Sequence, residues 1–370
     1  MKTKILFLIQ LPPPVHGASA VNKSIQNSSH VNKSFSTKFI NISPATGLAD
    51  IGKIEPAKML KMLKILCNVV GSFRTFKPDL VYLTLSPHGL AFYKDGLIAI
   101  VLKLMGAKLV FHLHGKGIQK EARKSWLKLQ AYKLVFKKVD IIHLSDKLFS
   151  DLAEVRDPTM AIISVANGID NSDYFNQPPK DKILTFIYLS NLIRAKGADI
   201  LIRATALICK EHQKKFRVKI IGSHSSNEYV TELNELITPE LTEIINISGP
   251  KYGKDKALEL CTSHIFVLPT KNDCFPLSIL EAMAAGLAVI STNEGAISDI
   301  VEDEVTGNVL REPSAEALAE VMIKYIEDQE YTASCSHMSQ QKFLENYTQH
   351  IFERNLVLAL ERLTQRSKIQ

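Results

Sequence analysis

The chain has 370 residues, enough for two domains of ordinary size, and its 46% hydrophobic and 22% charged residues exclude a disordered or fibrous protein. Five cysteines without a Cys-x-x-Cys pair argue against a disulfide framework or a zinc site and fit a reducing compartment. Of the net charge of +7, residues 1–175 contribute about +12 (24 Lys and Arg against 12 Asp and Glu) and the remainder about −5 (21 against 26), so the first half should attract polyanions or anionic lipid.

The chain opens with a short apolar run, Lys4–Gln10, that we interpret as a buried first strand. A signal peptide is the alternative, but the run is short and leads into prolines 12–14 without a cleavage site of small residues. The apolar stretch 97–113 is interrupted by Lys103 and Lys108, so we expect no transmembrane helix and a cytoplasmic protein.

Further apolar runs recur along the chain, as in strands covered on both faces. They are 80–85, 109–113, 140–144, 161–165, 184–189, 218–221, 244–247, 265–268 and 288–291. Helical patterns separate them at 55–70, 120–138, 198–211, 229–236, 255–262 and 277–285. Strands that alternate with helices predict parallel sheets of β-α-β units, hence an α/β fold of two doubly wound, Rossmann-like domains facing a cleft.

The domain boundary is predicted near residues 171–182, a polar segment with paired prolines that suits a linker. We therefore expect a first domain over residues 1–172 and a second over 180–345. The stretch 341–363 is long and amphipathic. We expect one helix there that crosses back, so that residues near 345–370 join the first domain.

The most informative segment is 269–292, where a buried strand ends in a loop and a new helix begins. Proline suits the first turn of a helix, and the free amides of that turn, aided by the helix dipole, form a ready site for a pyrophosphate. Those amides belong to Leu277, Ser278 and Ile279. Two carboxylates, Asp273 and Glu281, flank this turn and could accept hydrogen bonds from hydroxyls. An acidic turn that merely stabilises its own helix remains the alternative.

Within this segment, the sequence DCFPLSILEAMAAGLAV resembles the E-x7-E motif of the retaining GT-B glycosyltransferases of family four. The resemblance implies that Asp273 contacts the donor sugar and that Glu281 holds the ribose hydroxyls of the nucleotide. It places the backbone of Phe275 and Pro276, with that of Leu277 and Ser278, beside the donor. Aspartate replaces the family glutamate at 273 and proline replaces a glycine at 276.

A second segment, YLSNLIRAKGADILIRA at 188–204, resembles the family's G-R-L-x-x-x-K-G segment, whose Arg and Lys clamp the donor diphosphate. Lys196 and Gly197 match it. Asn191 stands where the family has arginine, and Arg194 is a candidate replacement cation. Because lysine contacts phosphate as a point charge and arginine as a fork, this exchange is not neutral. A solvated loop lysine is the alternative for Lys196.

Three further residues complete the candidate donor site. Gly17 follows the first strand in a loop that resembles the family's glycine loop, and its lack of a side chain would let a ligand approach the backbone. His114 closes the strand at 109–113, where the resemblance places a histidine near the reacting centre; an imidazole bonded to backbone is the alternative. Gly249 lies where the family contacts the base. His112 and His114 have no third metal ligand nearby, so no metal or other cofactor is expected.

These segments imply transfer of a hexose-type sugar, with retention, from a UDP- or GDP-sugar to a lipid-linked or oligosaccharide acceptor in O-antigen, capsule or exopolysaccharide synthesis. His114, Lys196 and Asp273 are the catalytic candidates. A nucleotide-sugar epimerase of the same fold is the alternative. A basic nucleic-acid-binding protein is a further one, but the sequence holds no recognised nucleic-acid-binding module, so we expect no nucleic-acid partner.

Two Lys-rich amphipathic stretches, 55–70 and 116–138, bear on location. Such helices can lie on anionic lipid, although most of them face a protein core. Peripheral contact with the inner face of the cell membrane is therefore an expectation, and core packing is its alternative.

Overall fold

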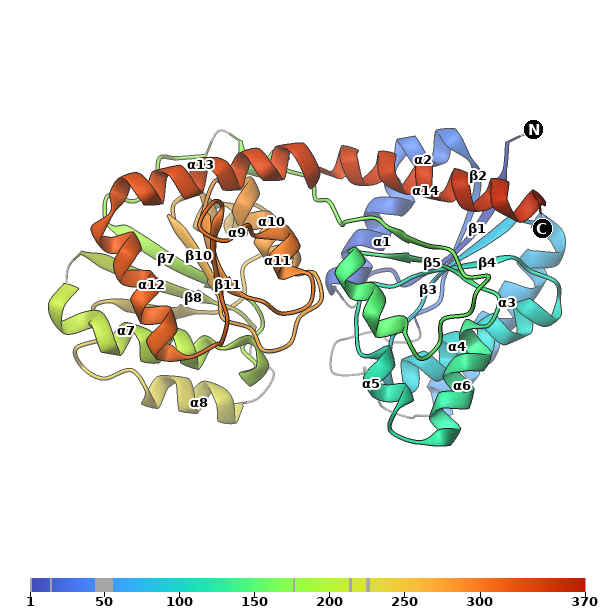
Figure 1. Cartoon of the computed structure of the whole chain (residues 1–370), viewed down its shortest axis with the longest axis horizontal. Helices are drawn as coiled ribbons and strands as arrows, with labels where there is room; N and C mark the ends of the chain where they lie inside the picture. The colour runs from blue at the N-terminus through green and yellow to red at the C-terminus, as the bar shows by residue number, and fades with distance from the viewer. Residues whose placement is uncertain are drawn as a thin grey trace. The chain divides into compact units, whose positions relative to one another are not determined.

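The computed structural model describes residues 2–13, 15–43, 56–175, 177–212, 215–223 and 227–369 (Figure 1). The chain divides into two compact units. Unit 1 comprises Met1–Gly168 and Gln349–Gln370, and unit 2 comprises Ile169–Thr348. The polar segment 171–182 therefore belongs to unit 2, and the division along the chain falls just before it.

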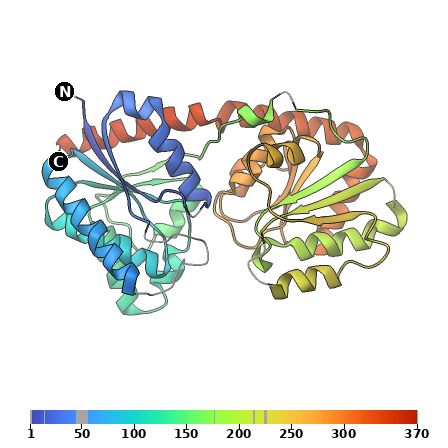
Figure 2. The same ribbon diagram turned by 180° about the vertical axis from the view of Figure 1, so that it is seen from behind.

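Unit 1 is a parallel sheet with helices on both faces (Figures 1 and 2). Its strands are β1 Lys4–Ile9, β2 Ser36–Asn41, β3 Leu80–Thr84, β4 Leu109–His112, β5 Asp140–His143 and β6 Ile162–Ser164. Its helices are α1 Gly17–Asn27, α2 Ser29–Ser34, α3 Pro56–Phe76, α4 Gly89–Leu104, α5 Ile118–Ala122, α6 Trp126–Phe136, the 3-10 helix η2 Asp146–Leu152 and α14 Gln349–Ile369. Helices α3, α4 and α6 cover one face of the sheet, and α1, α2 and α14 cover the other.

Unit 2 repeats this architecture around a second parallel sheet. Its strands are β7 Leu184–Leu189, β8 Phe216–Ile221, β9 Ile245–Ser248, β10 Ile265–Leu268, β11 Ala288–Thr292 and β12 Gly307–Leu310. Its helices are α7 Ala198–His212, α8 Asn227–Glu235, α9 Gly253–Cys261, α10 Leu277–Ala284, α11 Ile297–Ile300, α12 Ala315–Glu327, α13 Gln329–Asn346 and the 3-10 helices η3 Ser172–Tyr174 and η4 Arg194–Lys196. Both units thus confirm the predicted doubly wound α/β fold.

The strand order locates the crevice of each sheet. Unit 1 has the order β2-β1-β3-β4-β5-β6, and unit 2 has the order β12-β11-β10-β7-β8-β9. In open parallel sheets ligands bind beyond the carboxyl ends of the strands, where the connections turn in opposite directions. That point lies between β1 and β3 in unit 1 and between β7 and β10 in unit 2.

The core of unit 1 forms because its central strands are apolar on both faces. Every residue of β3 and β4 is buried, and α4 packs against them through Phe92, Ile98 and Leu102. Over the described residues, no helix is both long and apolar enough to cross a membrane.

Two expectations about helices were wrong. The stretch 120–138 forms two helices rather than one, because the Ser125 hydroxyl accepts the Lys128 amide and starts α6 anew. The single helix expected at 341–363 is broken at Tyr347 and Thr348, where Thr348 pairs with Ile169 in an isolated bridge. The two helices on either side of this break, α13 and α14, belong to different units.

Candidate active site

The loops that follow β7 and β10 meet at the crevice of unit 2. The Lys271 amide donates to the Ala195 carbonyl at 2.8 Å, and the Thr270 hydroxyl donates to the same oxygen at 3.1 Å. Gly197 has a φ of 78°, and a Cβ there would lie 2.3 Å from the Pro269 carbonyl oxygen. Only glycine fits so close an approach in this conformation, so the position after Lys196 requires glycine.

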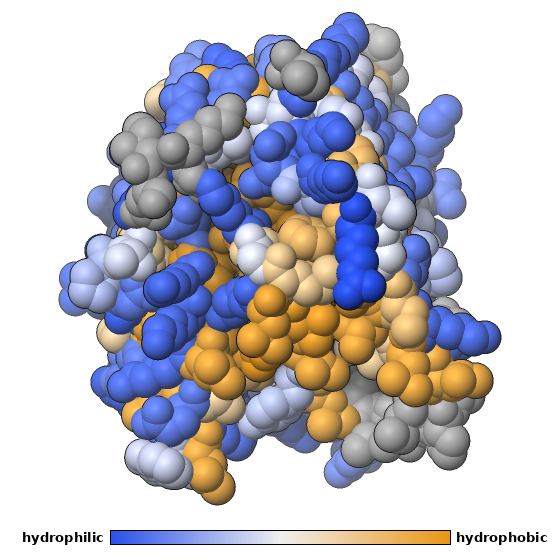
Figure 3. Space-filling view, turned by 90° about the vertical axis from the view of Figure 1, so that its right-hand side faces the viewer, coloured by the Kyte–Doolittle hydropathy of each residue, from blue (hydrophilic) through white to orange (hydrophobic). Residues whose placement is uncertain are grey.

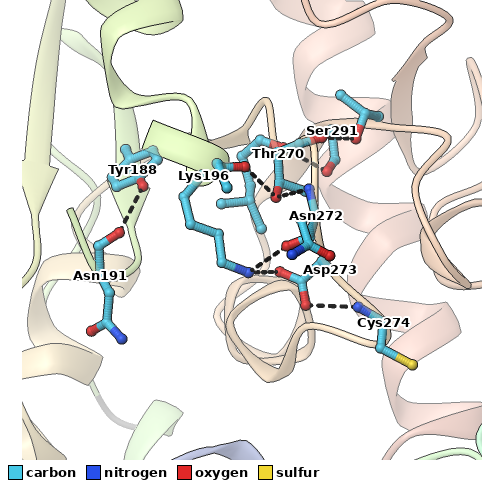
Figure 4. Close-up of polar contacts among 11 residues, drawn as sticks. Tyr188, Asn191, Lys196, Thr270, Asn272, Asp273, Cys274 and Ser291 are labelled. Carbon is cyan, nitrogen blue, oxygen red and sulfur yellow. Dashed lines mark hydrogen bonds and ion pairs between the residues drawn. The ribbon is translucent and has the colours of Figure 1, made fainter. Parts of the chain in front are cut away.

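A cation and a carboxylate face each other across these two loops (Figure 4). Lys196 Nζ forms an ion pair with Asp273 Oδ2 and donates to the Asn272 carbonyl at 3.1 Å. Asp273 Oδ1 accepts the Cys274 amide at 3.0 Å. The two side chains are 18% and 16% exposed, so both still reach solvent. The structure therefore brings together two residues that the sequence predicted from separate motifs.

Helix α10 begins four residues after Asp273, with Pro276 as its N-cap. The Ile279 amide donates to the Pro276 carbonyl at 3.2 Å, so the expectation that this amide is free was wrong. Within the described part of the chain, the amides of Leu277 and Ser278 have no hydrogen-bond partner. Two amide donors at the positive end of a helix dipole remain available for an anion.

The loop after β11 packs against the backbone of the Asp273 loop. Gly295 has a φ of 59°, and a Cβ there would lie 2.6 Å from the carbonyl oxygens of both Asp273 and Cys274. The Ala296 amide donates to the Cys274 carbonyl at 2.8 Å. These contacts hold the Asp273 backbone in place, and they require glycine at 295.

Glu281 lies on α10, where its carboxylate forms an ion pair with Lys256 of α9 at 2.5 Å. The two side chains are 16% and 22% exposed. Sequence reasoning did not identify Lys256, because a lone lysine in a helix gives no signal of its own. Both carboxylates assigned to the donor thus carry a lysine partner in this structure.

Arg194 and Asn191 have other partners. The Arg194 guanidinium donates to both oxygens of Glu232, at 2.8 and 2.5 Å, and lies 5.2 Å from the centroid of the Tyr229 ring. Asn191 Oδ1 accepts the Ser223 hydroxyl at 2.7 Å. Over the described residues, no hydrogen bond or ion pair joins either side chain to the Lys196–Asp273 pair. A phosphate contact by Arg194 would require it to leave Glu232.

At Phe275 and Gly249 the backbone, rather than a side chain, is available to a ligand. The Phe275 ring is buried and lies edge-on to Tyr347, with the ring centroids 6.2 Å apart. Gly249 follows β9 and is exposed, and a Cβ there would contact nothing within 4 Å. The space around Gly249 leaves room for a ligand.

In unit 1, the loop after β1 leads into α1. Gly17 is the first residue of this helix rather than part of a free loop. His16 is the N-cap: its Nδ1 accepts the Ser19 amide at 3.3 Å, while the Ser19 hydroxyl accepts the His16 amide at 2.9 Å. Gly17 is exposed, so its backbone at the helix start stays accessible.

His114 lies two residues beyond β4, beside a buried cluster of polar rings. Its ring centroid is 4.1 Å from that of His112, whose Nδ1 is hydrogen-bonded to the Tyr82 hydroxyl. Burial, with nearby His143 and His16, lowers the pKa of His114 to about 3, although Asn167 acts in the opposite direction. The His114 ring is therefore neutral near pH 7, and it can accept or donate a hydrogen bond but supplies no charge.

Among the described residues, no group of three His, Cys, Asp or Glu side chains could hold a metal ion. Cys67, Cys209, Cys261, Cys274 and Cys335 are free thiols.

Comparisons with known proteins show a likeness to glycosyltransferases. Residues 170–342 match the family described as glycosyl transferases group 1. The chain is 25% identical over 242 residues to WcaL of Escherichia coli, named for colanic acid biosynthesis, covering 63% of this chain and 59% of that protein. It is 25% identical over 277 residues to the amylovoran biosynthesis glycosyltransferase AmsK of Erwinia amylovora, covering 71% of this chain and 66% of that protein. The chain thus spans less than two thirds of the length of either relative.

A solved structure supports the fold. Anabaena HepE in complex with UDP superposes with a TM-score of 0.75 at 18% identity, covering 97% of this chain and 100% of that one. At this identity the likeness shows the architecture, with two Rossmann-like units in each chain. The chain therefore has the GT-B fold, and its residues 170–342, just under half of its length, match the glycosyl transferases of group 1.

Proposed function

We propose that the chain transfers a hexose-type sugar from a nucleotide sugar to a lipid-linked or nascent surface polysaccharide. The observation that carries this proposal is the meeting of Lys196, Asp273 and the free amides of Leu277 and Ser278 at the crevice of unit 2. A cation and two amide donors suit a diphosphate, and an adjacent carboxylate suits sugar hydroxyls.

The donor diphosphate lies against the start of α10 in this proposal. Lys196 Nζ turns from Asp273 to a phosphate oxygen, because a doubly charged diphosphate offers it a stronger partner than a single carboxylate. Asp273 is then free to accept hydrogen bonds from the donor sugar. Both side chains are partly exposed, which leaves room for this exchange.

Glu281 accepts hydrogen bonds from the ribose hydroxyls, while Lys256 keeps its ion pair with Oε1 of the same carboxylate. The exposed backbone at Gly249 faces the base. Asn191 and Arg194, bonded to Ser223 and Glu232 in this structure, reach the phosphates only if they leave these partners. In unit 1, Gly17 has an exposed backbone and His114 has a neutral hydrogen-bonding ring, and their assignment to the donor stays a prediction.

The reaction breaks the bond between the anomeric carbon and the diphosphate oxygen, and the electron pair leaves with the diphosphate. The acceptor hydroxyl forms its new bond to the same face of that carbon, and its proton passes to the departing diphosphate. Lys196 and the two amides stabilise the developing negative charge in a fixed geometry. Because these groups supply positive charge, the reaction needs no metal ion.

The names of the relatives support the acceptor class. WcaL and AmsK are named for the biosynthesis of colanic acid and amylovoran, and the HepE structure contains UDP. We therefore propose UDP- or GDP-sugar as donor and a growing surface polysaccharide or its lipid carrier as acceptor. An acceptor carried in a membrane brings with it a peripheral contact between this protein and anionic lipid.

A panel of UDP-, GDP- and ADP-sugars tests this function. One of them should raise the melting temperature in the presence of EDTA, and a ligand at 100 times its Kd stabilises by about 2.7 kcal/mol. Release of the nucleoside diphosphate should then require an added lipid-linked glycan, which separates transfer from epimerisation. Absence of any shift across the panel, or turnover without acceptor, contradicts the proposal.

A further inference from the structure

Helix α4 exposes an apolar stripe where a surface helix normally carries polar residues. Leu90, Tyr93, Leu97 and Leu104 recur at the three- and four-residue spacing of one helical face, and they are 47%, 45%, 47% and 84% exposed. The opposite side of the same helix packs into the core through Phe92, Ile98 and Leu102. The helix is therefore apolar on both sides, although only one side is covered by the protein.

The neighbouring helices extend this stripe into a surface. Leu60 and Leu63 of α3 are 57% and 58% exposed, and Trp126, Leu127 and Leu134 of α6 are 69%, 72% and 56% exposed. Figure 3 shows an apolar area bordered by hydrophilic side chains on this end of the molecule. We call the outward side of α3, α4 and α6 the basic apolar face.

Close packing makes α4 and α6 one rigid platform. The Phe92 and Tyr132 rings stack with centroids 3.7 Å apart, and a Cβ on Gly96 would lie 2.9 Å from Val135. Lys103 Nζ donates to the carbonyls of Val135 at 2.7 Å and of Leu134 at 2.8 Å. The exposed leucines of the two helices therefore belong to a single surface.

The charge of this layer is strongly one-sided. Residues 56–138 contain 16 Lys and Arg against three Asp and Glu. Of the three acids, Asp95 is buried beside Lys94, and Glu121 is paired with Lys124 and Lys128. Five exposed lysines on or beside α3 and α6 form no ion pair with any residue that the structure describes: Lys61, Lys64, Lys133, Lys137 and Lys138.

We propose that the basic apolar face binds the surface of an anionic lipid bilayer. The proposal names the surface that makes the membrane contact proposed above. It rests on the proposed glycosyl transfer only for its biological setting. Leucine side chains enter the boundary between headgroups and acyl chains while lysines contact lipid phosphates, as on other interfacial helices. Trp126 suits the headgroup level, where tryptophan is enriched.

The charge pattern favours lipid over a second copy of the chain. A two-fold symmetric dimer through this face would set the unpaired lysines of one copy against those of the other, because such an interface is self-complementary. An anionic bilayer instead neutralises every lysine at once and also accepts the leucines. Lipid is therefore the occupant that satisfies both the apolar and the basic residues.

Vesicle binding by the full chain tests the proposal. We expect cosedimentation with phosphatidylcholine vesicles that contain phosphatidylglycerol, little with phosphatidylcholine alone, and weakening as salt rises. Trp126, the single tryptophan of the sequence, should shift its fluorescence to the blue on binding. Binding that ignores lipid charge, or no binding to either vesicle, overturns the proposal.

Two triple variants separate the contributions. Lys64→Gln, Lys133→Gln and Lys137→Gln together should weaken binding by about a hundredfold, at about fivefold for each lysine near an anionic surface. Leu97→Gln, Leu104→Gln and Leu134→Gln together should abolish the Trp126 shift. As matched controls, Leu207→Gln and Leu358→Gln alter leucines of similar exposure on α7 and α14, and Lys33→Gln removes a lysine on α2.

Folding and donor binding are checked in parallel. Both triple variants should keep the melting temperature shift given by the nucleotide sugar, because all six replaced residues belong to unit 1 whereas Lys196 and Asp273 belong to unit 2. Loss of vesicle binding, with the melting temperature shift retained, supports lipid binding by the basic apolar face. Vesicle binding equal to wild type in both triple variants overturns it. A wild-type dimer that the leucine variants dissociate also overturns it in favour of self-association. A failed nucleotide shift with intact vesicle binding would instead count against the proposed transferase.

Discussion

Lys196 forms an ion pair with Asp273 across 77 positions of the sequence, and the pair joins the loops that follow two adjacent strands, β7 and β10. The pair keeps a cation and a carboxylate together, partly exposed, at the edge of the sheet where parallel α/β folds bind ligands. Without a donor, each side chain neutralises the other. With a donor, we expect each to find a different partner.

Replacing Lys196 with alanine should lower kcat/KM for the nucleotide sugar by about a hundredfold to a thousandfold, the usual effect of removing one group that stabilises a leaving anion. Among the described residues, Lys196 is the only side-chain cation that pairs with Asp273. In the proposed reaction it moves to the diphosphate, so its loss removes the side-chain charge that stabilises the leaving anion. Turnover with a lipid-linked acceptor measures it. Lys271→Ala is the matched control, since Lys271 is exposed on the loop of Asp273 and joins Ala195 only through its backbone amide. Equal effects of the two substitutions would remove Lys196 from its assigned role.

Replacing Gly295 with alanine should displace the Asp273 loop. The new Cβ would lie 2.6 Å from two carbonyl oxygens in a left-handed backbone conformation. We expect a loss of roughly 2 kcal/mol or more in the free energy of unfolding, together with weaker donor binding. Urea denaturation and nucleotide titration measure the two effects.

Gly249→Ala provides the comparison, because its Cβ meets nothing within 4 Å. Its free energy of unfolding should change by no more than about 0.5 kcal/mol. If Gly295→Ala lost no more stability than Gly249→Ala and bound the nucleotide sugar as tightly as wild type, the Gly295 loop would not support the site.

Replacing Arg194 with alanine should change donor affinity by less than about threefold, because a surface ion pair with Glu232 holds its side chain away from the Lys196–Asp273 pair. Its guanidinium is engaged by both oxygens of Glu232. Isothermal titration with the nucleotide sugar measures the affinity, and Lys196→Ala in the same assay marks the effect of a true phosphate contact. A loss above tenfold would mean that Arg194 leaves Glu232 and replaces the family arginine missing at Asn191.

The central strands were predictable because covered strands are apolar on both faces. The runs at 184–189 and 265–268 match β7 and β10 to the residue. The edge strands β2 and β12 were missed. β2 has the sequence STKFIN, with only one buried residue, because an edge strand is open to solvent and needs no continuous apolar run.

The helix break at Tyr347 and Thr348 was not predictable, because the amphipathic pattern continues through it. Tertiary contacts decide the break: the Ile169 amide donates to the Tyr347 carbonyl at 3.0 Å, and Thr348 bridges Ile169. Local propensity carries no information about a partner so far away in the chain.

At the site, sequence motifs predicted residue types but not pairings. That Lys196 meets Asp273 depends on β7 lying beside β10, which is a property of the sheet order. The Lys256–Glu281 pair depends likewise on α9 lying beside α10. The capping of α1 by His16 was missed because serine, rather than histidine, is the usual N-cap. In the structure Ser19 is the third residue of α1 and only completes the cap that His16 begins.

Acid should destabilise unit 1 through its buried histidines. Burial lowers the pKa of His143 to about 3, and its Nδ1 accepts the Leu144 amide at 2.9 Å. Below the unfolded pKa of about 6.5, the unfolded chain binds a proton that the folded chain refuses, so stability is full above pH 6.5 and falls toward pH 3. At pH 5 the loss from this one group is about 2 kcal/mol.

His143→Asn should keep the acceptor for Leu144 but remove the titration. Its free energy of unfolding should therefore fall less than that of wild type between pH 7 and pH 5, as measured by urea denaturation at both values. His337→Asn, an exposed site on α13, should behave as wild type. An unchanged pH dependence in His143→Asn would refute the assignment.

Hydrogen exchange of the full chain, with and without the nucleotide sugar selected by thermal shift, tests the donor site most directly. The account predicts slower exchange at the amides of Leu277 and Ser278 and in the loop around Lys196 when the donor is bound. Donor binding that leaves the exchange of these amides unchanged would contradict it.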